Sequence, residues 1–126
     1  MNNAQTFLNY CNSMMRLALP LFEKELAKCG LTKYQIGQGI DFPGAPHPVG
    51  KAWLTEPYGI YAKARNSQSG EDETIQITIC PAEGWKPILS VASTSLDPVM
   101  FETTYSAERD IVLIQKQIEN CFARLR

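Results

Sequence analysis

The stretch TIQITIC, residues 74–80, indicates the fold class because its side chains alternate between apolar and polar. Ile75, Ile77 and Ile79 fall on one side of an extended chain, and the β-branched residues among them favour a strand. The segment 58–65, YGIYAKAR, alternates in a similar way, and the polar residues NSQSGED between the two segments are typical of a hairpin loop. The acidic run 71–73 is expected to be a solvated part of this loop. The two segments therefore predict an antiparallel β-hairpin with one apolar face.

Further strands are predicted after this hairpin. Residues 88–95 place Leu89 and Val91 on one face, and the Asp97-Pro98 pair ends that segment. Residues 99–105 and residues 31–36 carry shorter, more mixed patterns. The sequence therefore predicts an antiparallel sheet of three to four strands.

Two amphipathic helices flank the predicted strands. Apolar side chains recur at helical spacing over residues 4–29, where Pro20 is expected to kink or restart the helix and Gly30 to end it. A second helix is expected after Ser106, a good N-terminal cap, with a narrow apolar stripe. Both helices need the same apolar sheet face for cover, so the predicted class is α+β with both helices on one face.

Length and composition limit the kind of protein. The chain has 126 residues, of which 44% are hydrophobic and 20% charged, as expected for one globular domain over residues 1–126. Lys and Arg number 12 against 13 Asp and Glu, which gives a net charge of −1. That balance disfavours a dedicated nucleic-acid-binding protein, because such proteins carry a basic excess.

Cysteine spacing and hydropathy indicate the compartment. Cys11, Cys29, Cys80 and Cys121 form no CxxC pair, so they are expected to be reduced thiols, with structural disulfides as the alternative. The apolar run 17–22 is too short for a signal peptide, and no run is long enough to span a membrane. A cytoplasmic protein without membrane contact is therefore expected.

Motifs for catalysis, metals and cofactors are lacking. His47 is the single histidine, and its neighbours Pro46 and Pro48 supply no nucleophile. No metal-ligand spacing and no phosphate-binding glycine motif occur, so neither a metal nor a cofactor is predicted. A non-enzymatic function is favoured, although a hydrolase that uses the loop around His47 stays open.

Two regions are predicted to bind a partner. The segment 37–59, GQGIDFPGAPHPVGKAWLTEPYG, holds five of the eight glycines and four of the eight prolines, and long loops of this kind are often functional. A passive connector is the alternative for this loop. The second region is the polar face of the first predicted hairpin strand, because Tyr and Arg frequently anchor interfaces. The predicted binding residues are Asp41, His47, Lys51 and Trp53 in the loop and Tyr61, Lys63 and Arg65 on the strand.

These observations favour a small non-catalytic protein that binds another macromolecule, of the inhibitor, immunity, chaperone or adaptor type. The alternative is a protein that binds or sequesters a small molecule, such as a nucleotide or another anionic ligand. A homodimer is also predicted, because Leu8, Met15 and Leu19 widen the apolar stripe of the first helix beyond what one small sheet face covers.

Overall fold

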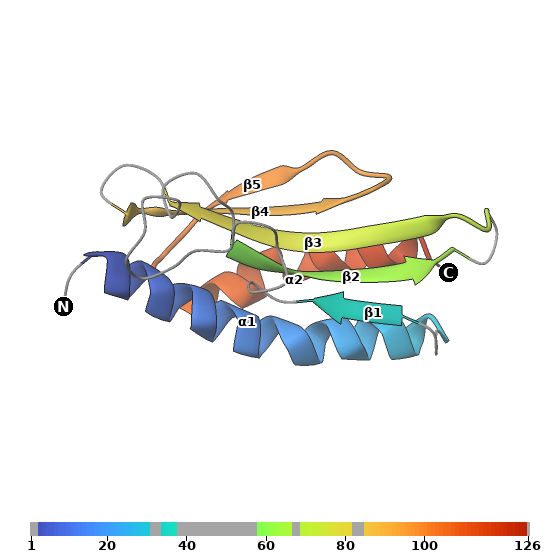
Figure 1. Ribbon diagram of the computed structural model, residues 1–126, viewed down its shortest axis with the longest axis horizontal. Helices are drawn as coiled ribbons and strands as arrows, with labels where there is room; N and C mark the ends of the chain where they lie inside the picture. The colour runs from blue at the N-terminus through green and yellow to red at the C-terminus, as the bar shows by residue number, and fades with distance from the viewer. Residues whose placement is uncertain (1–2, 31–33, 38–57, 67–68, 82–84, 126) are drawn as a thin grey trace.

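A helix at each end of the chain frames five strands (Figure 1). The computed structural model describes residues 3–30, 34–37, 58–66, 69–81 and 85–125. Helix α1 spans Asn3–Lys28, and helix α2 spans Ala107–Ala123. The strands are β1 Tyr34–Gly37, β2 Tyr58–Arg65, β3 Asp72–Pro81, β4 Pro87–Ser93 and β5 Val99–Glu102.

The strands form one sheet in the order β1-β2-β3-β4-β5, and every neighbouring pair is antiparallel. The antiparallel α+β class is confirmed, while the predicted count of three to four strands is too low. The two edge strands β1 and β5 have only four residues each. Such short strands show little periodicity of their own, because pairing with the longer strands β2 and β4 defines them.

The apolar alternation of β3 points toward the helices. Ile75, Ile77 and Ile79 are fully buried, and Ile60 of β2 lies opposite Ile77. Leu89 and the rest of the inner face of β4 continue the same layer. The predicted inward face of the hairpin is therefore confirmed.

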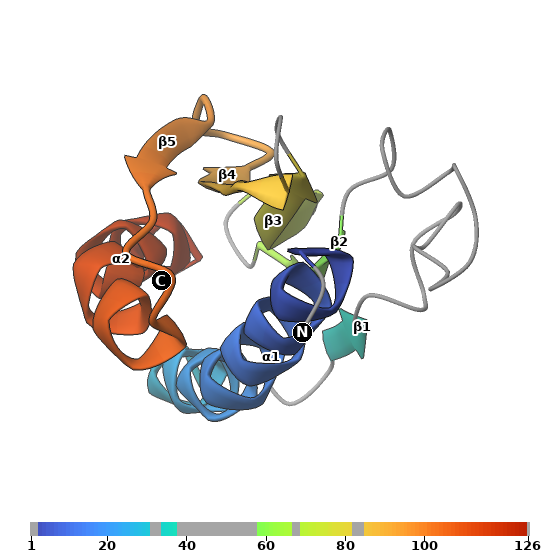
Figure 2. The same cartoon turned by 90° about the vertical axis from the view of Figure 1, so that its left-hand side faces the viewer.

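Both helices cover the same face of the sheet (Figure 2). Helix α1 packs beneath β2, α2 packs beneath β3 and β4, and the two helices contact each other. Phe22 of α1 and Phe122 of α2 meet edge to face, with ring centroids 5.3 Å apart. The buried core contains Phe7, Cys11, Met14, Ala18, Phe22, Leu26, Ile114, Ile118, Cys121 and Phe122 from the helices.

Helix α1 runs without interruption through Pro20, so the expected restart of the helix at that residue is wrong. The Pro20 ring lies on the exposed side of the helix, where the missing N–H removes only one backbone hydrogen bond. The predicted stop is confirmed, because Gly30 adopts φ +70° directly after the helix. At α2, the Ser106 side chain accepts a hydrogen bond from the Arg109 backbone N–H, which confirms the predicted cap.

The second apolar stripe of α1 is used within the chain. Met15 is buried, and Leu8 and Leu19 are half-buried against the core of the same chain. The homodimer stays a prediction, but the stripe that motivated it has a partner inside the chain. A second copy would need another surface.

The four cysteines carry free thiols, as predicted. Cys11 and Cys121 are buried, and burial raises the pKa of both thiols above the ordinary value. Neither helix of the described residues has the length and hydrophobicity needed to cross a bilayer.

Candidate functional site

The predicted binding residues divide between two parts of the chain. Asp41, His47, Lys51 and Trp53 lie outside the described residues, so their role as a binding loop stays a prediction. The other three predicted residues lie on β2, within the described part of the sheet.

Tyr61, Lys63 and Arg65 all lie on the outer face of the sheet. They alternate along β2 with buried residues such as Ala62 and Ala64, which face the helices. Within the described residues, no helix crosses this outer face (Figure 2). The predicted orientation of the three side chains is therefore confirmed.

Asp72 of β3 connects the two cations of β2. Its Oδ2 lies 3.7 Å from Lys63 Nζ, and its Oδ1 lies 3.5 Å from Arg65 Nε. The antiparallel register explains this arrangement, because Arg65 lies directly opposite Asp72. Tyr61 Oη accepts a hydrogen bond of 3.2 Å from Gln35 Nε2 of β1. Cross-strand contacts thus orient polar side chains of three neighbouring strands.

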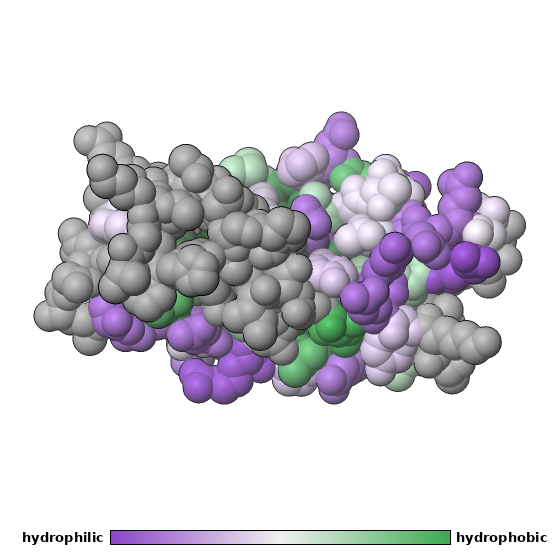
Figure 3. Space-filling view, in the orientation of Figure 1, coloured by the Kyte–Doolittle hydropathy of each residue, from purple (hydrophilic) through white to green (hydrophobic). Residues whose placement is uncertain are grey.

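These side chains border a depression of about 480 Å³ at one end of β1, β2 and β3. Figure 3 shows hydrophilic surface over the right-hand ends of β2 and β3. Two cations share a single carboxylate here, which leaves a positive excess within the lining. The depression is lined by Tyr34, Gln35, Lys63, Ala64, Arg65 and Asp72.

The acidic run 71–73 divides between solvent and core. The sequence predicts a solvated loop for all three residues, and Glu71 and Asp72 are indeed exposed. Glu73 is buried, where its two carboxylate oxygens accept hydrogen bonds from the backbone N–H and the hydroxyl of Ser95, each 2.9 Å long. For Glu73 the prediction is wrong, because its position in β3 points it inward together with Ile75.

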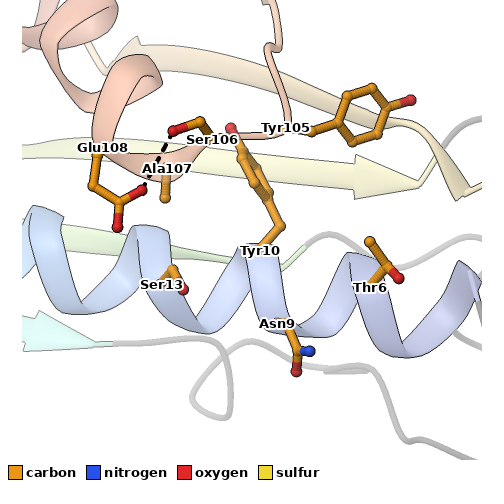
Figure 4. A pocket seen from close by; sticks show the side chains of 8 residues that line it. All are labelled: Thr6, Asn9, Tyr10, Ser13, Tyr105, Ser106, Ala107 and Glu108. Carbon is orange, nitrogen blue, oxygen red and sulfur yellow. Dashed lines mark hydrogen bonds between the residues drawn. The ribbon is translucent and has the colours of Figure 1, made fainter. Parts of the chain in front are cut away.

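A second depression, of about 400 Å³, lies between α1 and the start of α2 (Figure 4). Tyr10 projects from α1 toward α2, where its hydroxyl donates to the buried Asp110 carboxylate. Burial, together with this hydrogen bond to Asp110, raises the pKa of Tyr10 above its ordinary value of 10.0. Ser106 Oγ donates to Glu108 Oε2 at 3.3 Å. The hydrogen bond from Tyr10 to Asp110 thus joins the two helices beside this depression.

Metal chemistry finds no support in the described part of the chain, where no three His, Cys, Asp or Glu side chains form a ligand cluster. Comparison of the chain with protein-family models, with curated proteins and with solved structures finds no match. The chemistry of the candidate site therefore rests on its own residues.

Sequence reasoning missed Tyr34, Gln35 and Asp72 as neighbours of the predicted site. A signal for Asp72 was present, because the predicted hairpin pairs the end of its first strand with the start of its second. Tyr34 and Gln35 had no such signal. Their strand β1 is separated from β2 by a long segment of the chain. The pairing of β1 with β2 therefore depends on tertiary structure and leaves no local pattern in the sequence.

Proposed function

We propose that this protein is a non-catalytic binding protein that docks an acidic segment of another protein on the outer face of its sheet. The observation that supports the proposal is the pair Lys63 and Arg65, which share Asp72 on the same outer face as Tyr61. Inhibitors, immunity proteins, chaperones and adaptors are the classes of binding protein to which this proposal applies. The four free thiols fit a reducing compartment, and we propose the cytoplasm as the location.

A carboxylate of a partner protein could readily replace Asp72 at one of the two cations. The Lys63 side chain is 49% exposed and that of Arg65 is 72% exposed, so their ion pairs with Asp72 are solvated. Ion pairs of this kind contribute about 0–1 kcal/mol to stability. A carboxylate from a partner can therefore engage one cation while Asp72 keeps the other. The aromatic ring of Tyr61, on the same outer face, is of the residue type that interfaces favour.

The surrounding charges favour a protein over a nucleic acid. Nucleic acids require several cations along the phosphate backbone, since each phosphate contact adds to affinity. Here two cations lie beside the exposed acids Glu71 and Asp72, and the whole chain has a net charge of −1. This mixed pattern suits a short acidic segment.

A small anionic ligand is the second candidate. The depression of about 480 Å³ falls within the range of about 300–1,000 Å³ that is typical of ligand pockets. A nucleotide or a similar anion would meet the same Lys63 and Arg65. The hydrolase alternative around His47 concerns a segment outside the described residues and stays a prediction.

Charge reversal tests the proposal. The double variant Lys63→Glu/Arg65→Glu should lose the protein that wild type captures from lysate of its source cell, while Lys24→Glu/Lys116→Glu should retain it. The control changes net charge by the same amount on exposed helix positions. Mass spectrometry of the denatured wild-type protein would detect a retained small molecule, which would favour the second candidate. Equal capture by both double variants would contradict the site.

A further inference from the structure

Asp72 lies between the two cations of the candidate site, at the closed end of the hairpin of β2 and β3 (Figure 1). The register places Asp72 directly opposite Arg65. Lys63 lies opposite Thr74 and is therefore a diagonal neighbour of Asp72. Each carboxylate oxygen faces a different cation, Oδ1 the Arg65 Nε and Oδ2 the Lys63 Nζ. Asp72 thus bridges the two cations as a carboxylate from outside the chain would.

This bridge is loose. The two distances, 3.5 Å to Arg65 and 3.7 Å to Lys63, exceed the roughly 2.7–2.9 Å of a charge-assisted hydrogen bond. The Asp72 side chain is 46% exposed, so water reaches the carboxylate as well as both cations. Exposed ion pairs stabilise a fold only weakly. All eight residues of β2 pair with β3, so the hairpin does not depend on the bridge.

The other charges near the hairpin lie outside this bridge. Glu71 is exposed in the loop before β3 and forms no ion pair within the described part of the chain. Glu73 is buried on the inner side of the sheet. Arg124 comes directly after α2, in the helical layer. Among the described residues, Asp72 is therefore the one acid that is paired with the two cations.

We propose that Asp72 is an internal competitor of the docked acidic segment and selects segments that carry neighbouring acidic side chains. This inference rests on the proposed function. A partner with one carboxylate gains little, because it only exchanges one carboxylate for another at these cations. A partner with two carboxylates can displace Asp72 from both Lys63 and Arg65. A repulsive group built into a site is a common means of rejecting weaker partners.

Peptide titrations test the competition. The probe is a synthetic peptide with a single glutamate in a neutral Gly-Ser sequence, and the backbone amide NMR signals of β2 report its binding. Asp72→Asn should lower the Kd by about two- to fivefold, because one carboxylate then reaches both cations. The matched control Glu71→Gln makes the same change in net charge without freeing a cation, so its Kd should stay close to that of wild type.

A second peptide tests the selection. In wild type, a peptide with two adjacent glutamates should bind more tightly than the peptide with one. Asp72→Asn should reduce this difference, since the single carboxylate no longer competes with an internal one. At high salt the three proteins should converge, because the Debye length falls to about 3 Å at 1 M. An Asp72→Asn variant that binds the single-glutamate peptide as wild type does, or more weakly, would overturn the competitor role and make Asp72 a residue that positions the cations.

The variant Lys63→Glu/Arg65→Glu separates this inference from the proposed function. Loss of peptide binding in this variant supports the docking site, and the comparison of Asp72→Asn with wild type then decides the role of Asp72 alone. If neither wild type nor Asp72→Asn binds either peptide, both proposals fail. Circular dichroism should show the same fold for every variant, because all the substituted side chains are exposed.

Discussion

Two carboxylates are equally inaccessible to solvent in this protein but have different surroundings. Asp110 accepts hydrogen bonds from the Tyr10 hydroxyl and from both the backbone N–H and the hydroxyl of Thr104. Glu25 has the Lys28 ammonium at 3.0 Å, and no hydrogen bond to its carboxylate oxygens is found among the described residues. Burial is favourable for a carboxylate only when it is well hydrogen-bonded. Asp110 therefore joins α1, α2 and the segment between β5 and α2, whereas Glu25 joins nothing beyond its own helix.

The largest effect is expected for Asp110→Ala. The substitution leaves the buried Tyr10 hydroxyl and the Thr104 N–H without an acceptor, at about 1–3 kcal/mol each, so the free energy of unfolding should fall by about 3–5 kcal/mol. Urea denaturation followed by circular dichroism measures the change. A loss below about 1 kcal/mol would show that water replaces the carboxylate easily.

Alkaline pH should weaken the contact between Tyr10 and Asp110. The folded state raises the pKa of Tyr10 above its ordinary value of 10.0, so the protonated phenol stabilises the fold below that pH. Above about pH 10 the unfolded chain loses the proton first, and stability should fall by about 1.4 kcal/mol per pH unit from this group. Urea midpoints measured from neutral to strongly alkaline pH would reveal the slope.

The variant Tyr10→Phe serves as the control for that slope and carries its own prediction. It should lose about 1–2 kcal/mol at neutral pH, because Asp110 keeps both hydrogen bonds from Thr104. Its alkaline slope should be shallower than that of wild type, and the remainder should come from buried thiols such as Cys11. An unchanged slope would assign the alkaline effect to groups other than Tyr10.

The smallest effect is expected for Glu25→Met. A side chain of similar length without charge removes the buried carboxylate, and Lys28 remains half-exposed to water. Replacing a buried ion pair by apolar groups is often neutral or stabilising, so the change should stay within about 1 kcal/mol or be a gain. The same urea measurement decides it. A loss as large as that of Asp110→Ala would mean that the two carboxylates play comparable roles.

The difference between the two carboxylates also shows what could be predicted from the sequence. The pattern after Ser106 predicts the start of α2 and places Asp110 near the positive end of the helix. It does not predict the contact with Tyr10, which lies 100 residues away in the chain. Periodicity reports on neighbours within an element, and contacts between elements depend on packing.

The same dependence on patterns within one element explains which features of the sheet could be predicted. The alternation in β3 predicts which side chains are buried, and it correctly places Lys63 and Arg65 on the outer face. The edge strands β1 and β5 are too short to show a clear period, so the sequence undercounts the strands. Tyr34 was missed for that reason. The contacts of Asp72 with Lys63 and Arg65 could have been predicted, because β2 and β3 form a hairpin that is local in the sequence.

Because α2 packs against both α1 and the sheet, the core can be completed only after the last element of the chain has been synthesised. The meander from β2 to β5 can pair as each hairpin leaves the ribosome, since every strand lies beside its successor in the chain. Its inner face, with Ile77 at the centre, nevertheless lacks half of its helical cover until α2 emerges. A nascent chain paused before α2 therefore exposes an apolar sheet and depends on chaperones that bind such surfaces.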